Sequence, residues 1–177
     1  MRIGYSCVLI AALSGFITDI PPPLKARFAS TNAVDGTFVQ TKTTADGAKY
    51  LTKGTYEIRP GTSFTWRTVD PFETCFFATP TNYVYSNEDE SVTKRISDMP
   101  GHSRFDGLVR GDFSAFFKAF DALYAEEGGR FYVRAKPKVS ELKRHLRRVD
   151  IEGVVTNWTL RAELQDGTVF SFELRDR

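Results

Sequence analysis

Short runs of alternating apolar and polar residues, separated by tight-turn signals, are the feature that most limits how this chain can fold. The run from Thr55 to Arg59 places Tyr56 and Ile58 on one face of an extended strand. Pro60-Gly61 ends that run, because Pro cannot donate to a strand ladder and Gly accepts the positive φ of a tight turn. Alternation then resumes from Ser63 to Val69. This segment therefore predicts a β-hairpin.

The same pattern recurs along most of the chain. Asp46-Gly47 and Asp166-Gly167 are typical two-residue hairpin turns between alternating runs. We expect nine or ten strands, of which the first six, joined by tight connections, form an antiparallel meander. The predicted strands are Val34–Thr43, Lys49–Arg59, Ser63–Val69, Glu73–Ala78, Asn82–Ser86, Ser91–Ile96, Arg130–Ala135, Arg148–Glu152, Val154–Leu164 and Val169–Leu174.

Two helices are predicted among these strands. Asp112 is a good N-cap, Gly128-Gly129 supplies a stop, and apolar residues between them recur at helical spacing. That stripe comprises Phe113, Phe116, Phe117, Phe120, Leu123 and Tyr124. It either packs directly on the sheet as core or roofs a ligand space above it. A second, shorter helix is predicted from Val139 to Leu146.

Composition fits one domain with a large apolar interior. The chain has 177 residues, and 14% of them are aromatic, including 15 Phe, which indicates a large core or an apolar cavity. A net charge of +2 implies no polyanionic partner. One local basic cluster we interpret as a solvated face rather than a nucleic-acid site. Its members are Lys136, Lys138, Lys143, Arg144, Arg147 and Arg148.

The first 32 residues read as processing and linker segments. Arg2 precedes an apolar run, Cys7–Leu13, and Ala12-Leu13-Ser14 offers small residues for cleavage, so residues 1–14 are predicted to be a signal peptide. The run is too short to span a bilayer, and the alternative is a buried first strand or helix of a cytosolic protein. Pro21-Pro22-Pro23 indicates that residues 15–32 are a linker with a short helix at most. Residues 33–177 then form a single domain.

Neither cysteine is expected to form a disulfide within the chain. Cys7 follows no lipobox, so no lipid anchor is predicted, and its removal with the signal peptide leaves Cys75 alone. Because Cys75 lies among phenylalanines, we expect it to be a small buried apolar residue.

No pattern in the chain is typical of an enzyme. His102 and His145 have no Cys, His or carboxylate at metal-ligand spacing. Gly-rich phosphate loops, the G-x-S-x-G elbow and C-x-x-C are absent from the sequence. We therefore predict no catalytic residue, no metal site and no cofactor.

Several motifs, taken in order, resemble those of the outer-membrane lipoprotein carriers, the LolA-like family. The central hairpin carries Arg59-Pro60, Phe64-x-Trp66 and Pro71-Phe72. The segment Gly36-Thr37-Phe38-Val39-Gln40 resembles the first-strand pattern of that family, and Gly54 stands where its next strand usually has Gly. Gly111-Asp112, Lys136-Pro137-Lys138 and Asp166-Gly167 follow in the same order. The resemblance runs from Ala33 to the C-terminus. The chain departs from the family before Ala33, where the helix is short.

The resemblance implies a mainly β protein with helices (α+β): a strongly curved antiparallel sheet, an incomplete β-barrel covered by a helical lid. It implies a periplasmic monomer that binds no nucleic acid and shuttles acylated lipoproteins, or other lipids, from an inner-membrane export complex to an outer-membrane acceptor. The expected lipid-binding residues are Phe38, Tyr56, Ile58, Phe64, Trp66, Phe113, Phe116, Phe117 and Phe120. Arg59, which matches the Arg of the family motif, is expected to act as a lid latch by donating hydrogen bonds to backbone carbonyls of the loop around Pro100 to Gly107 or of the start of the following helix. Two alternatives stay open: a carrier dedicated to one glycolipid or other acylated product, and a lipid- or lipoprotein-sensing regulatory module.

Overall fold

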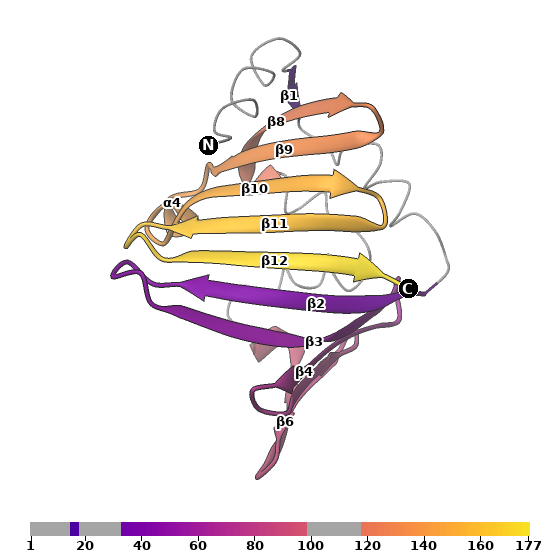
Figure 1. Cartoon of the computed structure of the whole chain (residues 1–177). Coiled ribbons are helices and arrows are strands. Elements are labelled where there is room, and N and C mark those ends of the chain that lie inside the picture. Colours follow the sequence, from indigo (N-terminus) through magenta and orange to yellow (C-terminus); the bar gives the residue numbers. More distant parts are fainter. Residues whose placement is uncertain (1–14, 18–32, 99–117) are drawn as a thin grey trace.

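The structure, a computed structural model, describes residues 15–17, 33–98 and 118–177, and this part of the chain is mostly β (Figure 1). Two short helices lie entirely within the described residues: the 3₁₀ turn η2 at Ile96–Asp98 and α4 at Ser140–Lys143. The strands are β1 Gly15–Ile17, β2 Val34–Thr43, β3 Lys49–Arg59, β4 Ser63–Asp70, β5 Thr74–Ala78, β6 Asn82–Asn87, β7 Ser91–Arg95, β8 Phe120–Glu127, β9 Arg130–Pro137, β10 Leu146–Val154, β11 Asn157–Leu164 and β12 Val169–Asp176.

All twelve described strands belong to one antiparallel sheet in the order β1-β8-β9-β10-β11-β12-β2-β3-β4-β5-β6-β7. Most neighbours are joined by hairpins, but β12 pairs with β2 from Val169↔Thr43 to Asp176↔Gly36, which links the two ends of the sequence. Beyond β3 the sheet bends away, so that β4 and β6 run steeply from the plane of the other strands (Figure 1). The predicted curved antiparallel sheet is confirmed, and in the described residues it is open, with β1 and β7 as its edges.

The two faces of the sheet differ in character, as expected when one face of an antiparallel sheet is buried. One face, which we call the apolar face, carries the main core. Its buried residues are Phe38, Tyr56, Ile58, Ala119, Phe120, Ala122, Phe131, Val133, Ala135, Val149, Ile151 and Leu174. The opposite, polar face carries Thr, Arg, Glu and Asp at the alternate positions of β2, β3, β10 and β11.

The predicted long helix is wrong over its C-terminal part, because Phe120 to Glu127 forms β8. Phe120 and Ala122 are buried with Asp121 exposed between them, which is the two-residue period of a strand. Gly128 and Gly129 do not stop a helix; their positive φ values of 57° and 76° form the tight β8–β9 turn. Phe113, Phe116 and Phe117, together with the signal peptide, lie outside the described residues.

Smaller differences concern the termini of elements and one cysteine. Gly15–Ile17, in the segment interpreted as a linker, pairs as β1 with Ala122 to Tyr124 of β8. The predicted strand from Val154 to Leu164 is two elements, because β10 extends to Val154 and β11 begins at Asn157. Cys75 is half-buried rather than buried. In the described ranges there is no helix that is long and apolar enough to cross a membrane.

Candidate functional site: the aromatic face of the sheet

Trp66 is the centre of a continuous path of aromatic rings on the apolar face. Its ring stacks on Phe38 with centroids 3.8 Å apart and an interplanar angle of 22°. The rings of Tyr56 and Phe64 both lie 6.3 Å from it, and Phe172 meets it edge-on at 6.0 Å. Such offset and edge-on pairs are favourable beyond the area that they bury. Trp66 therefore joins rings from β2, β3, β4 and β12 into one surface.

The path continues from Trp66 toward the β7 edge of the sheet. Phe64 lies 6.3 Å from Phe76 of β5, and Phe76 lies 5.7 Å from Tyr83 of β6. These rings also pack on a second small core cluster around Ala78 and Ile96. The aromatic surface thus extends across both the flat part and the bent part of the sheet.

Two glycines make room for the rings that lie flattest on the sheet. Gly54 is directly opposite Phe38, and Gly36 is directly opposite Tyr56. A Cβ at Gly54 would lie 2.5 Å from the Phe38 ring, and a Cβ at Gly36 would lie 2.7 Å from the Tyr56 hydroxyl. Each ring therefore occupies the space that a side chain on the neighbouring strand would otherwise fill.

Tyr56 uses this space to bridge three strands. Its hydroxyl donates a hydrogen bond to Asp176 Oδ1. Asp176 of β12 faces Gly36 of β2, which in turn faces Tyr56 of β3. The phenol consequently crosses β2 where it has no side chain and links β3 to β12, which fixes the ring orientation next to Trp66.

Of the predicted lipid-binding residues, the structure brings Phe38, Tyr56, Phe64 and Trp66 into one set of contacts. Ile58 lies directly opposite Phe64, on the same face. Phe38, Tyr56, Ile58 and Phe120 are buried, whereas Phe64 and Trp66 are half-buried. Phe120 belongs to the same core, but it lies on β8, near the other edge of the sheet.

The sequence did not single out Phe76, Tyr83 and Phe172, which complete the ring path. Phe172 sits in a predicted strand, and its alternation with Phe170 and Leu174 was available as a signal. Its place beside Trp66 depends on the pairing of β12 with β2, two segments about 130 residues apart in sequence. No local pattern encodes that contact.

Arg59 lies on the polar face, away from the aromatic rings. Its Nε donates to Glu57 Oε1 at 2.7 Å, and its Nη2 lies 2.6 Å from the same oxygen. The guanidinium is more than half exposed. The loop from Pro100 to Gly107, which the latch was expected to hold, lies outside the described residues, so the latch stays a prediction.

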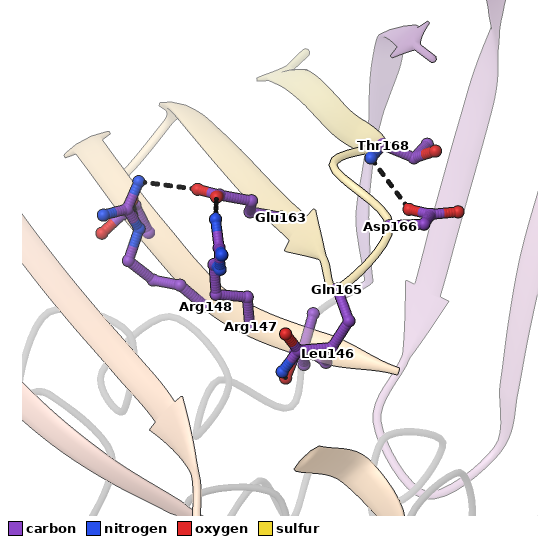
Figure 2. Close-up of polar contacts among 8 residues, drawn as sticks. Leu146, Arg147, Arg148, Glu163, Gln165, Asp166 and Thr168 are labelled. Atoms are coloured by element: carbon purple, nitrogen blue, oxygen red, sulfur yellow. Dashed lines mark hydrogen bonds and ion pairs between the residues drawn. The ribbon is translucent and has the colours of Figure 1, made fainter. Parts of the chain in front are cut away.

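The polar face carries a charge network over β9, β10 and β11. The register of β10 against β11 shifts between Leu146 and Arg148, so Arg147 is the extra residue of a β-bulge. Figure 2 shows the result: Arg147 and Arg148 both donate to Glu163, at 2.8 and 2.9 Å. The hydrogen bond from Arg147 holds the pKa of Glu163 below its usual value. Arg148 also pairs with Asp150, which accepts from Arg134 at 2.7 Å.

Two hollows lined by described residues lie over the polar face and its margins. One, of about 310 Å³, is lined by residues that include Asp35, Thr55, Glu57 and Arg177. The other, of about 210 Å³, is lined by Glu73, Cys75 and neighbouring residues. Arg67 borders both. Neither is the apolar slot that the sequence predicts. In the part of the chain that the structure describes, no three His, Cys, Asp or Glu side chains gather as a metal site requires.

The described residues thus form an open, curved antiparallel sheet with one aromatic face. The family model described as outer membrane lipoprotein carrier protein LolA matches residues 29–175, and the chain belongs to this family. It is also 26% identical, over 181 residues, to an outer-membrane lipoprotein carrier protein of Serratia proteamaculans, covering 99% of this chain and 87% of that protein.

The solved structures that are similar over most of the chain include the following two. A LolA superfamily protein from Nitrosomonas europaea aligns with a TM-score of 0.46 and 9% identity, covering 87% of this chain and 89% of its own. An outer membrane lipoprotein-sorting protein domain from Vibrio parahaemolyticus aligns with a TM-score of 0.42 and 12% identity, with the same coverage. Both TM-scores are below 0.5, so family membership rests on the match of the family model.

Proposed function

We propose that this protein is a lipoprotein carrier that holds acyl chains against the aromatic face. The observation that carries the proposal is the unbroken ring path from Phe172 through Trp66 to Tyr83, in a chain of the lipoprotein carrier family. Rings of this kind supply large apolar area with little loss of side-chain freedom, which suits a ligand that has no polar group to recognise.

The burial of the rings divides the proposed site into a floor and a contact surface. Phe38, Tyr56, Ile58 and Phe120 are buried and form the floor. The half-buried rings of Phe64, Trp66, Phe76, Tyr83 and Phe172 are the ones that an acyl chain touches. We propose that Phe113, Phe116 and Phe117, which lie outside the described residues, also contact the acyl chain. Burying an acyl chain here gains about 0.8 kcal/mol for each CH₂ removed from water.

The carrier works in the periplasm, to which residues 1–14 direct it as a signal peptide. It accepts acylated lipoproteins from an inner-membrane export complex and passes them to an outer-membrane acceptor. It acts as a monomer. It needs no catalytic residue or cofactor, because the transfer of a non-covalently held acyl chain breaks no covalent bond.

Mass spectrometry of lipid extracted from the purified protein tests this function. Recovery of lipopeptide is the expected result. A single glycolipid would instead identify a carrier for one product, and a protein that holds no lipid but binds a regulatory partner would identify a sensor. Either of these results would overturn general lipoprotein carriage.

Competition binding tests the site. A diacylated peptide should displace an apolar fluorophore such as ANS from the native protein, and the same peptide without acyl chains should not. Phe64→Glu should abolish displacement. Phe77→Glu is the matched control, because Phe77 is a partly exposed aromatic on the opposite face of the sheet. Thermal melting of both variants separates lost binding from lost stability. Equal effects of the two changes would exclude the aromatic face as the site.

A further inference from the structure

Charged residues divide unevenly between the two ends of the strands. The ladders place residues 42–50, 118–121, 136–147 and 163–169 at one end, around α4 and the β2–β3 and β11–β12 turns, on the left of Figure 1. We call this the basic end, because its eight basic residues exceed five acidic ones. The basic residues are Lys42, Lys49, Lys118, Lys136, Lys138, Lys143, Arg144 and Arg147.

The other end of the same strands has the opposite balance. Residues 33–36, 56–63, 126–131, 152–158 and 173–177 meet there, and they include seven acidic and four basic residues. Among the described residues, the two ends of these strands therefore carry an opposite excess of charge, although the net charge of the chain is only +2.

Two of the five carboxylates at the basic end are held in ion pairs, and the end keeps three more basic than acidic residues. Asp121 pairs with Lys138 at 3.2 Å, and Glu163 is held by Arg147 and Arg148 (Figure 2). Asp46 and Asp166 accept hydrogen bonds within their own turns. In contrast, Lys49, Lys136, Lys143 and Arg144 are exposed and form no ion pair with any described residue.

Exposed apolar side chains lie among these cations. Tyr50 is 59% exposed and Val139 is 37% exposed. The Lys42 ammonium lies 6.0 Å from the centroid of the Tyr50 ring and 5.8 Å from that of Phe170. Tyr beside Lys and Arg is typical of side chains at a membrane–water interface, where the ring enters the headgroup layer and the cation meets phosphate.

We propose that the basic end is a docking surface for a bilayer rich in anionic phospholipid headgroups. Its cations come from three separate connections and project from flexible stems, which suits a diffuse phosphate layer better than the fixed pattern of an acidic protein. The acidic end is repelled by the same bilayer, so docking orients the strands along the membrane normal with α4 toward the lipid.

Flotation with vesicles tests the proposal. The protein should bind phosphatidylcholine vesicles that contain 30% phosphatidylglycerol, bind pure phosphatidylcholine vesicles far less, and lose most binding between 50 and 300 mM salt. Each Lys or Arg near an anionic surface contributes about fivefold in affinity. The triple variant K136E/K143E/R144E should therefore bind more weakly by on the order of a hundredfold.

The matched control is R130E/R175E/R177E, which makes the same charge change at the acidic end and should bind as the wild type does. The proposal would be overturned if binding did not depend on salt, or if neutral and anionic vesicles bound the protein equally well. It would also be overturned if the two triple variants lost the same affinity for anionic vesicles. Binding to a polyglutamate peptide without binding to vesicles would also overturn it, in favour of an acidic protein partner. Displacement of ANS by acylated peptide should be unchanged in both variants, which separates this surface from the acyl-chain site.

Discussion

At the scale of single residues, two glycines decide whether the aromatic path can form. Gly36 and Gly54 stand in strand interiors, where Gly usually weakens a sheet. Here the missing side chains let Tyr56 and Phe38 lie across the neighbouring strand, and Trp66 then stacks on Phe38. The loss of strand propensity is offset by contacts among large rings.

Gly54→Ala should destabilise the fold by roughly 1–3 kcal/mol, because the new methyl group would lie 2.0 Å from the Arg67 carbonyl oxygen and 2.5 Å from the Phe38 ring. Urea unfolding followed by tryptophan fluorescence measures the change. Gly47→Asn is the matched control: Gly47 has open space around it and a positive φ that Asn tolerates. If both variants lost the same free energy of unfolding, crowding at Gly54 would not be the cause of the destabilisation.

The latch predicted for Arg59 also belongs to this scale. An acyl chain of about 16 carbons gains on the order of 12 kcal/mol on leaving water, so a carrier needs an interaction that favours the empty state. A guanidinium can supply it by donating several hydrogen bonds to carbonyl groups of a closing loop. To do so, Arg59 must leave Glu57, its present partner.

Arg59→Leu should accept lipid but release it slowly, so the purified variant should contain more co-purified lipid than the wild type. Arg59→Lys should restore release only in part, because a point charge cannot bridge separate carbonyls as the planar fork does. Arg67→Leu is the control, since Arg67 is exposed on the adjacent strand and the same face. If Arg59→Leu held as much lipid as the wild type and transferred it at the same rate, the latch hypothesis would be wrong.

At the scale of elements, hairpins were the part of the fold that the sequence could predict. The predicted bounds of β2 and β3 match the structure, because Asp46-Gly47 fixes their register locally. Residues 120–124 could not be assigned in the same way. Phe120, Leu123 and Tyr124 continue a helical period, while Phe120, Ala122 and Tyr124 continue a strand period, and pairing with β9 decides between them.

The aromatic site, too, could be predicted only where its residues belong to one hairpin. Tyr56, Phe64 and Trp66 could be placed together from one hairpin, since they face each other across its turn. Phe172 and Phe76 join them only through the order of strands in the sheet, which local periodicity does not contain. The bulge that turns Arg147 toward Glu163 is equally invisible, because an extra residue in a strand leaves no composition signal.

The contact of Glu163 with two arginines makes this part of the sheet sensitive to pH. Its pKa is lower in the folded than in the unfolded chain, so it stabilises the fold above its usual pKa of about 4.3, and this contribution disappears as pH falls through the folded pKa. Glu163→Gln should therefore lower the free energy of unfolding at pH 7 by on the order of 1 kcal/mol, which lowers the melting temperature. Below about pH 3 the variant and the wild type should melt at nearly the same temperature.

Melting curves between pH 3 and pH 7 measure this effect. Glu173→Gln is the control, because Glu173 lies on the neighbouring strand with a more exposed and longer ion pair to Arg175, at 3.8 Å. A Glu163→Gln effect that does not vary with pH would contradict the charge-based explanation.

At the scale of the whole molecule, one sheet serves several tasks because its faces and ends differ. The apolar face holds the core and the proposed acyl-chain site, the polar face carries the charge network, and the basic end is the proposed surface for an anionic bilayer. In the described residues the sheet is open, with edges at β1 and β7, and we expect an acyl chain to reach the apolar face past one of them.

If the acyl chain completes the apolar face, loading should stabilise the entire fold and not only the site. A ligand that binds only the folded state stabilises it by about 2.7 kcal/mol at a concentration of 100 times Kd. For a chain of this size, that corresponds to a rise in melting temperature of roughly 5–10 °C. A diacylated peptide should produce this rise, increasing with the logarithm of its concentration, and the same peptide without acyl chains should produce none. Phe64→Glu should remove the rise, and Phe77→Glu should keep it. A rise of equal size with both peptides would assign the binding to the peptide rather than to the acyl chain.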